Sequence, residues 1–508
     1  MYKCTTCDRY HNDEGSILKD LYIAGEWTEA ASGAGSQTVN PADATVLQTV
    51  SEADPSDVDC AVAAARAAFD TGPWPRTPAA RRATLLNAIA DLLQRDREAL
   101  ARTETLDTGK TLRESRLDVD DVTAGFRYYA GLADGHAGRV VDTGNPDAVS
   151  RIVHEPVGVC ALIAPWNYPL LQMSWKLAPA LAAGNTVVLK PSELTPLTTI
   201  ALVRLAEEAG APPGTVNLLL GGGATVGQAL VAHPRVDLIS FTGGLGTGEK
   251  IMAAAARGVR RVALELGGKN PNIVFADSDL DTAVDFALTA AFLHSGQVCS
   301  AGSRLILQDA IHDEFTAALA ERAEAIRLGS GLDPDSEAGP LVSAAQRAKV
   351  ERHIVGALAE GAVLLAGGVR PAEPELAAGF FLRPTVLGGC TRAMSVVREE
   401  IFGPVVTVER FSTEDEAVRL GNDTDYGLAG AVFTSDTGRA ERVARALRHG
   451  TVWINDFHPY LPQAEWGGFG KSGIGRELGP SGLEEYQEKK HIYHRVNPEP
   501  LRWFSEGS

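Results

Sequence analysis

One cysteine in this chain lies in a loop whose composition suits covalent chemistry. The loop, residues 296–304, reads Gly-Gln-Val-Cys-Ser-Ala-Gly-Ser-Arg, with Cys299 at its centre, and we call it the cysteine loop. Glycines at positions 296 and 302 permit close backbone approach, and an apolar segment expected to be helical ends near His294. A free cysteine is more often a small buried hydrophobic residue, so inert packing is the alternative. We interpret Cys299 as a candidate nucleophile.

An amide and a carboxylate lie at the ends of two expected strands. Asn167 lies in Pro-Trp-Asn-Tyr-Pro, where two prolines stiffen the turn, so its amide could be preset to donate to a developing oxyanion. Glu265 lies in the apolar run Val-Ala-Leu-Glu-Leu, before two glycines. Burial would raise the pKa of that carboxyl group, which suits a general base. An ordinary strand-end carboxylate is the alternative for Glu265.

Two further turns could hold a nucleotide. Residues 241–248, Phe-Thr-Gly-Gly-Leu-Gly-Thr-Gly, follow an expected strand and open a helix, so backbone N–H groups could meet a phosphate there. The spacing is not a strict Gly-x-Gly-x-x-Gly fingerprint, and a plain glycine turn is the alternative. Lys190 and Glu193, in Lys-Pro-Ser-Glu, follow another strand and could grip ribose hydroxyls. A solvated turn is the alternative for this second stretch.

Parallel strands would have to position these residues, and the sequence pattern predicts such strands from residue 151 onward. Short apolar runs alternate there with helical segments, which is typical of parallel strands joined by crossover helices. The expected strands are residues 157–164, 186–189, 216–220, 238–241 and 261–264, with helices at 170–183, 196–210, 224–232 and 246–257. A second series runs from a strand at 272–275 to a strand at 451–455. We therefore predict two α/β domains that join near Gly267 and Gly268.

The segment before these strands is expected to be mainly helical. Residues 21–27 predict one short strand, and helices are expected from a cap at Ser56 or Asp57 to Phe69 and from Thr77 or Pro78 through Arg97. Residues 98–106 and 117–132 continue the helical pattern.

Size and composition narrow the class of protein. At 508 residues the chain exceeds one hydrophobic core, and two or three domains are expected. The 65 acidic residues outnumber the 47 basic ones, which argues against a nucleic acid as general partner and is compatible with a cationic small substrate. Six cysteines are few for this length and no apolar signal peptide opens the sequence, so we expect a cytoplasmic protein.

Two local patterns resemble a zinc site and a membrane-spanning helix, but neither is complete. Cys4, Cys7 and His11 form half of a zinc pattern without a second half nearby, so residues 1–19 are interpreted as a polar leader and no metal site is predicted. Residues 156–175 carry no charge, but Pro165, Asn167 and Gln172 interrupt the apolar run. We therefore predict no membrane-spanning helix.

Six motifs in order give the chain a clear resemblance. Pro-Trp-Asn-Tyr-Pro, Lys-Pro-Ser-Glu, Phe-Thr-Gly-Gly, Glu-Leu-Gly-Gly-Lys-Asn-Pro, Gly-Gln-Val-Cys and Glu-Glu-Ile-Phe-Gly-Pro-Val together resemble the aldehyde dehydrogenase superfamily, and the resemblance covers residues 20–503. It implies an α/β fold with a Rossmann-like NAD-binding domain at 20–135 and 157–266, and a catalytic domain at 267–455. Residues 456–481 would complete the active-site and interface loops. Segments 136–156 and 482–503 would bridge subunits of a homodimer or homotetramer.

The resemblance also implies a role for individual residues. Cys299 is similar to the family nucleophile, Glu265 to the general base and Asn167 to the oxyanion donor. Lys176 and Glu477 match positions used for proton movement or structural support. Expected NAD contacts are Ile163, Ala164, Pro165, Trp166, Lys190, Ser192, Glu193, Phe241, Thr242, Gly243, Gly244, Leu266, Glu400 and Phe402. Gly244 departs from the serine of many relatives, which leaves backbone N–H groups to meet the phosphate.

The implied reaction is oxidation of an aldehyde through a covalent intermediate. The Cys299 thiolate would add to the aldehyde, hydride would pass to NAD, and water activated by Glu265 would hydrolyse the thioester. Glu193 would favour NAD over NADP, because a carboxylate repels a 2′-phosphate. A histidine to activate the thiol is not evident, so backbone dipoles or the positive nicotinamide ring would have to lower its pKa. A cysteine hydrolase, which needs no nicotinamide, is the reading from another enzyme class.

Within the superfamily, residues 453–468 together with the cysteine loop resemble betaine aldehyde dehydrogenases. A trimethylammonium group has no N–H to donate and is held by aromatic faces. Tyr168, Trp175 and Trp466 match aromatic positions of that substrate pocket, whereas Leu293 replaces an aromatic residue of plant relatives, so Trp453, Phe457 or Tyr460 would have to close the cage. Ordinary core aromatics are one alternative for this set, and a broader aminoaldehyde dehydrogenase, acting on 4-aminobutanal-type substrates, is the alternative activity.

Overall fold

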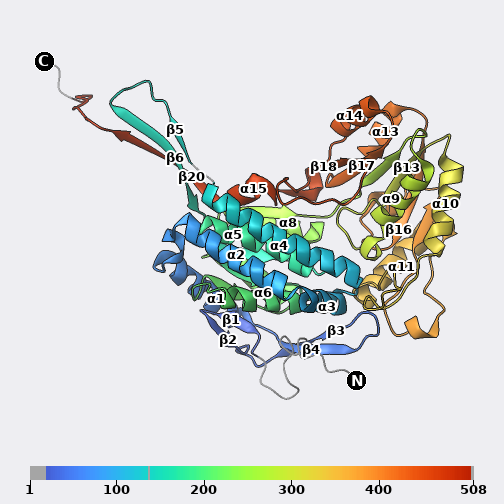
Figure 1. Ribbon diagram of the computed structural model, residues 1–508, viewed down its shortest axis with the longest axis horizontal. Helices are drawn as coiled ribbons and strands as arrows, with labels where there is room; N and C mark the ends of the chain where they lie inside the picture. The colour runs from blue at the N-terminus through green and yellow to red at the C-terminus, as the bar shows by residue number, and fades with distance from the viewer. Residues whose placement is uncertain (1–18, 136–137, 505–508) are drawn as a thin grey trace.

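The protein consists of two lobes and a projecting arm (Figure 1). The structure is a computed structural model that describes residues 19–135 and 138–504. The first lobe holds an eight-stranded sheet, the second lobe a seven-stranded sheet, and the arm a three-stranded sheet. The leader pattern of Cys4, Cys7 and His11 lies outside the described residues. Within the described residues, no helix is both long enough and apolar enough to cross a membrane.

The first sheet has a parallel centre. Its strands, in spatial order, are β19 (Gly473–Ile474), β11 (Arg261–Glu265), β10 (Leu238–Thr242), β7 (Val159–Ile163), β8 (Thr186–Lys190), β9 (Val216–Leu218), β1 (Leu21–Ile23) and β2 (Glu26–Thr28). The five strands from β11 to β9 run parallel, and β10, β7 and β8 are buried at every position. Such strands are covered on both faces, which explains why their sequences read as continuous apolar runs.

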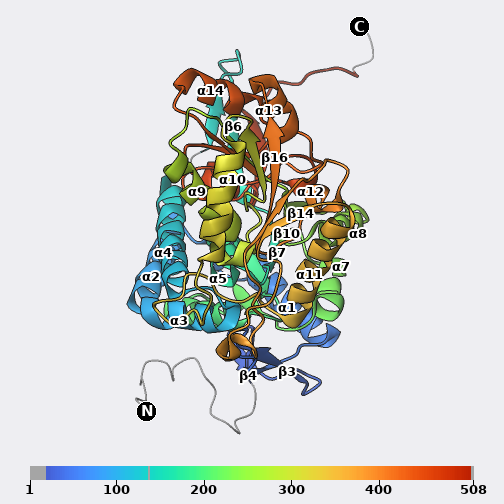
Figure 2. The same cartoon turned by 90° about the vertical axis from the view of Figure 1, so that its right-hand side faces the viewer.

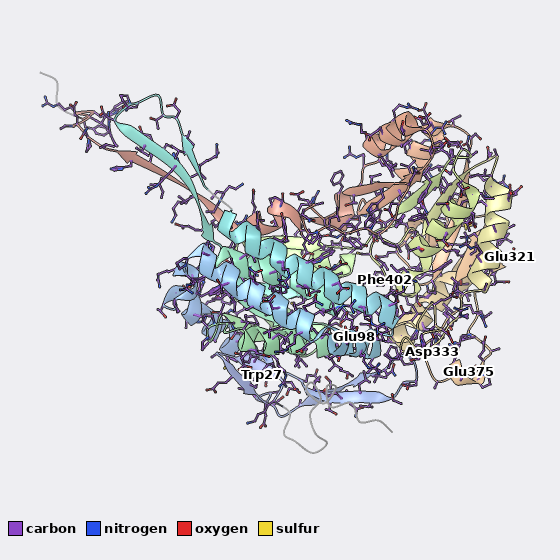
Figure 3. The ribbon with its side chains drawn as sticks, viewed as in Figure 1. Trp27, Glu98, Glu321, Asp333, Glu375 and Phe402 are labelled. Carbon is purple, nitrogen blue, oxygen red and sulfur yellow. The ribbon has the colours of Figure 1, made fainter. Side chains whose placement is uncertain are left out.

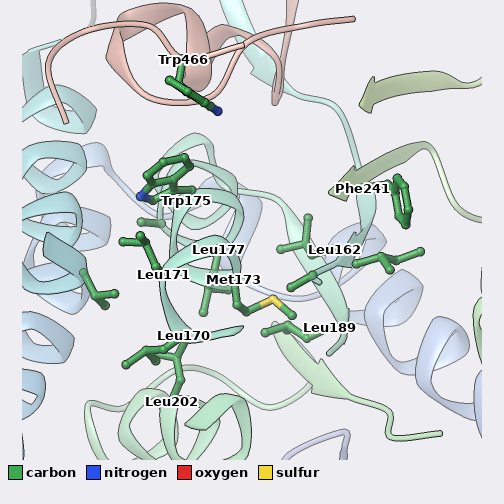
Figure 4. Packing of buried hydrophobic residues seen from close by; sticks show 14 of the residues in the cluster. Leu162, Leu170, Leu171, Met173, Trp175, Leu177, Leu189, Leu202, Phe241 and Trp466 are labelled. Atoms are coloured by element: carbon green, nitrogen blue, oxygen red, sulfur yellow. The ribbon is translucent and has the colours of Figure 1, made fainter. Parts of the chain in front are cut away.

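Helices cover both faces of this sheet. Figure 2 shows α2, α3 and α4 on one side and α7 and α8 on the other, with β7 and β10 between them. The helices are α1 (Pro55–Asp70), α2 (Ala79–Arg95), α3 (Arg97–Thr108), α4 (Leu112–Gly135), α5 (Pro169–Ala183), α6 (Leu197–Glu208), α7 (Gln228–Ala232) and α8 (Leu245–Ala256). Every residue of α5 is buried, because the helix lies between the sheet and α4 (Figure 4). Its side chains, among them Met173 and Leu177, form the middle of the hydrophobic core.

The second lobe repeats the parallel design. Its sheet runs β14 (Val363–Ala366), β15 (Thr385–Gly388), β16 (Val405–Phe411), β13 (Arg304–Gln308), β12 (Pro271–Val274), β17 (Ala429–Phe433) and β18 (Thr451–Ile454), all parallel except β14. The helices of this lobe are α9 (Leu280–Phe292), α10 (His312–Glu324), α11 (Ala344–Ala359), α12 (Ser395–Arg398), α13 (Glu414–Gly421) and α14 (Thr437–Ala446).

The arm pairs segments that are far apart in the sequence. Strand β6 (Ala148–Pro156) lies between β5 (Arg139–Val141) and β20 (Gln487–Arg495), and α15 (Gly479–Glu484) leads into β20. Several apolar side chains of the arm are exposed, including Val140 at 79% and Tyr493 at 54%. A small separate hairpin, β3 (Gly35–Val39) and β4 (Val46–Ser51), lies beside the first lobe.

The expected strands and helices of both series are confirmed, with local corrections. Residues 21–27 form a hairpin rather than one strand, because Ala24 and Gly25 adopt positive φ angles of 57° and 92° and reverse the chain. Helix α1 is capped by Asp54, not by Ser56 or Asp57, and Pro55 occupies its first turn. Strand β15 and the arm strands β5, β6 and β20 carry no strong alternation and were not predicted.

Candidate active site

The candidate residues of the first lobe meet because parallel strands end at one edge. The register pairs Ile163 with Lys190 and Thr242 with Glu265, each pair at the carboxyl ends of adjacent strands. Ligands of open α/β sheets bind at this edge. The structure therefore brings the turns after β7, β8, β10 and β11 to one place.

A large cleft follows this edge. It has a volume of about 1010 Å³. Eleven of the expected NAD contacts line it: Ile163, Ala164, Pro165, Trp166, Lys190, Ser192, Glu193, Phe241, Thr242, Gly243 and Gly244. Helix α8 begins at this cleft with Gly244 as its N-cap and no capping side chain, so the positive end of the helix dipole faces the space.

Lys190 and Glu193 lie together in this cleft. Lys190 is nearly fully buried, its Nζ donates to the carbonyl of Pro191 at 2.9 Å, and it lies 3.7 Å from a carboxylate oxygen of Glu193. Burial lowers the pKa of Lys190, and Glu193 opposes that effect. Glu193 is half-exposed, so its carboxylate is available to a ligand.

A smaller cavity of about 170 Å³ adjoins the cleft and shares residues with it. Cys299, Glu265 and Asn167 all line this cavity, although each is at least 34 positions from the others in the sequence. Leu266, Glu400 and Phe402, the remaining expected NAD contacts, also line this cavity. Phe402 lies between the two lobes (Figure 3), and its ring meets Trp166 edge-on with centroids 5.1 Å apart.

The cysteine loop is a tight turn between α9 and β13. Ala301 N–H donates to the carbonyl of Val298 at 3.0 Å, which places Cys299 inside a four-residue turn. Gly296 has φ of 70°, and a Cβ there would lie 2.1 Å from the carbonyl oxygen of Gly403, so only glycine fits. The loop is thus clamped against the segment that carries Phe402.

The protein surroundings of Cys299 raise the pKa of its thiol rather than lower it. Burial raises the pKa of the Cys299 thiol most, and the carboxyl groups of Glu400 and Glu265 raise it further. The backbone N–H groups of Ser300 and Cys299 act in the opposite direction. The backbone groups therefore favour the thiolate, but their effect on the pKa is smaller than that of burial.

Asn167 is held against the cysteine loop. Its Nδ2 donates to the backbone carbonyl of Gln297 at 2.8 Å, two residues before Cys299. An amide nitrogen carries two hydrogens, so one remains for an oxyanion formed beside Cys299.

Glu265 is a buried carboxyl group with a raised pKa. Burial is the largest cause, the neighbouring Glu477 adds to it, and Lys176 and Arg476 oppose it. One carboxyl oxygen of Glu265 has no hydrogen-bond partner among the described residues. A carboxyl group with these properties can accept a proton from a water molecule near neutral pH.

Lys176 and Glu477 form a buried ion pair beside Glu265. Lys176 Nζ donates to Glu477 and also to Thr242 Oγ1 at 2.7 Å. Burial raises the pKa of Glu477, and Lys176 opposes the increase. Glu477 and Trp466 exchange two backbone hydrogen bonds, so this pair also fixes the backbone of a predicted substrate-pocket residue.

Trp175, Trp453, Tyr460 and Trp466 form one aromatic cluster beside the cysteine loop, whereas the ring of Tyr168 contacts His294. Tyr460 meets Trp466 at 5.0 Å and Trp175 at 5.8 Å between ring centroids, and Trp453 stacks on Trp466 at 6.3 Å. Figure 4 shows Trp175 of α5 beneath Trp466 of the C-terminal segment. The Tyr460 hydroxyl lies 2.5 Å from Ser300 Oγ, which joins the cluster to the cysteine loop. Of the three residues expected to close the cage, Tyr460 and Trp453 both contact Trp466, and Phe457 packs against Trp453 at 4.8 Å between ring centroids.

Helix α4 places two acidic residues, Asp118 and Asp121, near the aromatic cluster, and the sequence pattern did not predict them as site residues. Asp118 raises the pKa of both Tyr168 and Tyr460, and Asp121 raises that of Tyr460, so both carboxylates lie near the cluster. Asp118 is paired with Lys110 at 2.6 Å, and Lys110 Nζ lies 3.9 Å from the centroid of the Tyr168 ring. Asp121 makes no salt bridge with any residue in 19–135 or 138–504.

Helix α11 adds Gln346 and Lys349 to the smaller cavity, and these were also missed. Gln346 Nε2 donates to the carbonyl of Phe402 at 2.6 Å. Both residues lie in an ordinary polar stretch of an amphipathic helix, so their spacing in the sequence does not indicate that they face a cavity.

His294, which was not expected to activate the thiol, is buried, and burial holds its pKa well below the usual value. Its ring meets that of Tyr168 edge-on, with centroids 5.4 Å apart. In the described part of the chain no group of three metal-ligating side chains is present.

Known proteins share both sequence and fold with this chain. The aldehyde dehydrogenase family pattern matches residues 27–492. The betaine aldehyde dehydrogenase of Bacillus subtilis is 56% identical over 489 residues, covering 96% of this chain and all of that protein. Pea (Pisum sativum) peroxisomal aminoaldehyde dehydrogenase 2 is 43% identical, covering 96% and 97%. The crystal structure of betaine aldehyde dehydrogenase from Staphylococcus aureus in complex with NAD+ superposes with a TM-score of 0.96 at 53% identity, covering 99% of both chains.

Proposed function

The chain belongs to the aldehyde dehydrogenase family, and we propose that it oxidises betaine aldehyde to glycine betaine with NAD. The observation that carries the proposal is the single cavity lined by Cys299, Glu265 and Asn167, which opens into the cleft at the strand ends. A nucleophile, a base and an amide donor in one cavity are what acyl transfer through a cysteine needs. The similar proteins described above favour the same activity.

The cleft fits NAD. The uncapped start of α8 at Gly244 offers backbone N–H groups to a pyrophosphate, and Gly244 itself leaves open space where a side chain would stand. Glu193 is the residue that would bind the adenosine ribose hydroxyls, and Glu400 and Phe402 those of the nicotinamide ribose. When bound, NAD supplies a hydride acceptor and a positive charge near the thiol.

The residues of the smaller cavity would carry out the covalent and proton-transfer steps of the reaction. The Cys299 sulfur, as the thiolate, forms a bond to the aldehyde carbon while the carbonyl π bond breaks, and the resulting oxyanion receives hydrogen bonds from Asn167 and from the Cys299 backbone N–H. After hydride departs, the sulfur holds the substrate as a thioester. Glu265 takes a proton from water, the hydroxide adds to the thioester carbon, and the Cys299 thiolate leaves with the acid as product. Lys176 and Glu477 sit beside Glu265 where they can exchange that proton.

The aromatic cluster and α4 together suit a cationic substrate. Tyr168, Trp175, Trp453 and Trp466 supply ring faces that attract a quaternary ammonium group. Asp121 lies near Tyr460 without a salt bridge among the described residues. Burial and the carboxylates of Asp118 and Asp120 raise the pKa of Asp121 to about 7, and a cationic substrate would favour its ionised form. Aminoaldehydes of the 4-aminobutanal type carry a charge as well, so they remain the second candidate substrates, and the pea aminoaldehyde dehydrogenase similarity supports that alternative.

The two lobes and the arm suggest a division of labour. Residues 20–135 and 157–266 would bind NAD, residues 267–455 would carry the catalytic loop, and residues 456–481 would complete the interface between the lobes. The arm, within 136–156 and 482–503, would join subunits of a cytoplasmic dimer or tetramer, since its exposed Val140 and Tyr493 offer apolar surface to a second copy. Sedimentation of the purified protein measures this assembly, and a monomer at micromolar concentration would refute it.

NADH formation across an aldehyde panel tests the proposal. Wild type is expected to prefer betaine aldehyde, then aminoaldehydes, over uncharged aliphatic aldehydes. Cys299→Ala is expected to abolish NADH formation, whereas the matched control Cys390→Ala should retain it, because Cys390 is a half-buried thiol outside both cavities. Activity that survives Cys299→Ala would overturn the mechanism, and a clear preference for uncharged aldehydes would overturn both candidate substrates.

A further inference from the structure

One side chain outside the cavity residues named so far holds the backbone of the nucleophile itself. Asn270 lies between the glycine pair at the joint of the lobes and strand β12, and it is 1% exposed. Its Nδ2 donates to the carbonyl of Cys299 at 2.9 Å and to the carbonyl of Ala301 at 3.0 Å. Its Oδ1 accepts from Ala429 N–H at 3.1 Å. Both amide hydrogens are therefore used on the turn that presents Cys299.

The bond to the Cys299 carbonyl has a consequence for the sulfur. That carbonyl belongs to the peptide group between Cys299 and Ser300, so fixing the oxygen also fixes the direction of the Ser300 N–H. The Ser300 N–H is one of the two backbone groups that act to lower the pKa of the Cys299 thiol, against the larger effect of burial. A hydrogen bond accepted by a peptide oxygen also polarises the N–H of the same peptide. Asn270 thus acts on a donor to the sulfur through one rigid peptide plane.

The surroundings of Asn270 are built to keep it in place. A Cβ at Gly268 would lie 2.4 Å from Asn270 Oδ1, so the glycine makes room for the amide. The backbone carbonyl of Asn270 accepts from Arg304 N–H at 3.2 Å, where the cysteine loop ends and β13 begins. Arg304 is itself buried and held by Glu409 at 2.8 Å and 3.0 Å. The loop is fixed at its centre and at its end by the same residue.

We propose that Asn270 is a positioning residue that sets the Cys299–Ser300 peptide group, and thereby makes the Cys299 sulfur nucleophilic and correctly directed for attack. The inference rests on the proposed role of Cys299 as nucleophile. Asn270 does not touch the substrate in this account and acts only through the backbone of the turn.

Other groups around the thiol are charged or titratable and enter its pH response. Glu265 at the end of β11 and Glu400 before Phe402 raise the pKa of Cys299. The hydroxyl groups of Tyr168 and Tyr460 interact with the thiol from the aromatic side. In the described structure, none of these side chains is hydrogen-bonded to the Asn270 amide, whose three side-chain bonds are to backbone groups. Replacing Asn270 therefore changes the backbone contribution and leaves these side-chain contributions in place.

Alkylation of the NAD-free protein by iodoacetamide, followed across pH and quantified on the Cys299 peptide by mass spectrometry, measures the effect. Asn270→Ala removes both donors, and Asn270→Asp keeps the shape but faces the two carbonyls with acceptors. We expect alkylation at pH 8 to slow about tenfold in Asn270→Ala, since two hydrogen bonds to the turn are lost. The pH at half-maximal rate should rise, and more strongly in Asn270→Asp.

Asn272 provides a matched control. It is a fully buried asparagine two residues further along, and neither of its side-chain polar atoms has a hydrogen-bond partner in the described chain. In the Asn272→Ala variant, iodoacetamide should alkylate Cys299 at the wild-type rate, and the pH at half-maximal rate should be unchanged. Thermal unfolding and NAD affinity by tryptophan fluorescence confirm that each variant is folded, and where Asn270→Asp does not fold, Asn270→Ala carries the test.

The outcomes separate a positioning role from a structural one. A folded Asn270→Ala protein with the wild-type rate and midpoint would overturn the proposal, and so would an equal loss in Asn272→Ala. A lower final extent of alkylation at an unchanged rate and midpoint would also overturn it, because that result means partial unfolding. A wild-type protein that forms no NADH with any aldehyde would instead refute the proposed function, while the alkylation comparison would still decide the role of Asn270.

Discussion

The two sides of the candidate site are built in different ways. The strand-end side, Ile163, Lys190, Thr242 and Glu265, comes from adjacent parallel strands of one sheet. The loop side, with Cys299, Phe402, Tyr460 and Trp466, comes from three segments of the chain that packing brings together. The strand-end side holds the buried Lys190 and Glu265, and the loop side holds the Cys299 thiol together with most of the aromatic groups. We infer that changes on the strand-end side affect chemistry, while changes in the aromatic part of the loop side affect substrate affinity.

Glu265→Gln gives the largest expected effect on the strand-end side. Turnover of betaine aldehyde should fall by about 10²- to 10⁴-fold, because the amide cannot take a proton from water. Only the ionised carboxyl acts as a base, and burial raises its pKa, so wild-type turnover should fall as pH drops through that raised pKa. The variant should lack this dependence. Stopped-flow and steady-state rates between pH 6 and 9 measure both effects, and a Glu265→Gln profile that keeps the wild-type slope would contradict the assignment.

Glu193→Gln examines cofactor choice on the same side. Removing the carboxylate should raise kcat/KM for NADP by about tenfold and lower that for NAD, since the repulsion of a 2′-phosphate is lost. The half-exposed position of Glu193 limits the change. Initial rates with each nucleotide measure these two changes in kcat/KM. A wild-type kcat/KM for NADP comparable to that for NAD would refute the NAD preference.

Trp466→Leu probes the loop side. The KM for betaine aldehyde should rise about tenfold with kcat nearly unchanged, because one face of the aromatic cluster is lost. Phe315→Leu is the control, since Phe315 is a fully buried aromatic residue of α10 that lines neither cavity. A drop in kcat without a change in KM would break the comparison between the two sides.

Asp121→Asn gives the smallest expected effect. The exposed carboxylate should contribute only a few-fold to the affinity for cationic aldehydes, and the effect should shrink as salt is added. An uncharged aldehyde should show no change. KM values at low and high ionic strength measure this, and an equal effect on charged and uncharged substrates would argue against an electrostatic role for Asp121.

The same comparison explains what the sequence could predict. Strand-end residues follow short apolar runs, so their positions along the chain already indicate a common edge, and the structure places Glu265 and Lys190 at that edge. The aromatic cluster could be assigned only through resemblance, because Trp175 and Trp466 lie in unrelated segments. Asp121, Lys349 and Asn270 were missed since helical or strand spacing gives no sign of what faces them across a tertiary contact. Hairpin β1–β2 was read as one strand because a two-residue turn at Ala24 and Gly25 hardly interrupts the apolar pattern.

The most direct test of the account is to trap the covalent intermediate. Glu265→Gln, mixed with betaine aldehyde and NAD, should release about one NADH per active site in a burst and then stall. Mass spectrometry of the digested protein should find the acyl group of glycine betaine on the peptide that carries Cys299. A burst of NADH with Cys299 unmodified, or with the acyl group on another residue, would contradict the central claim that this sulfur carries the substrate.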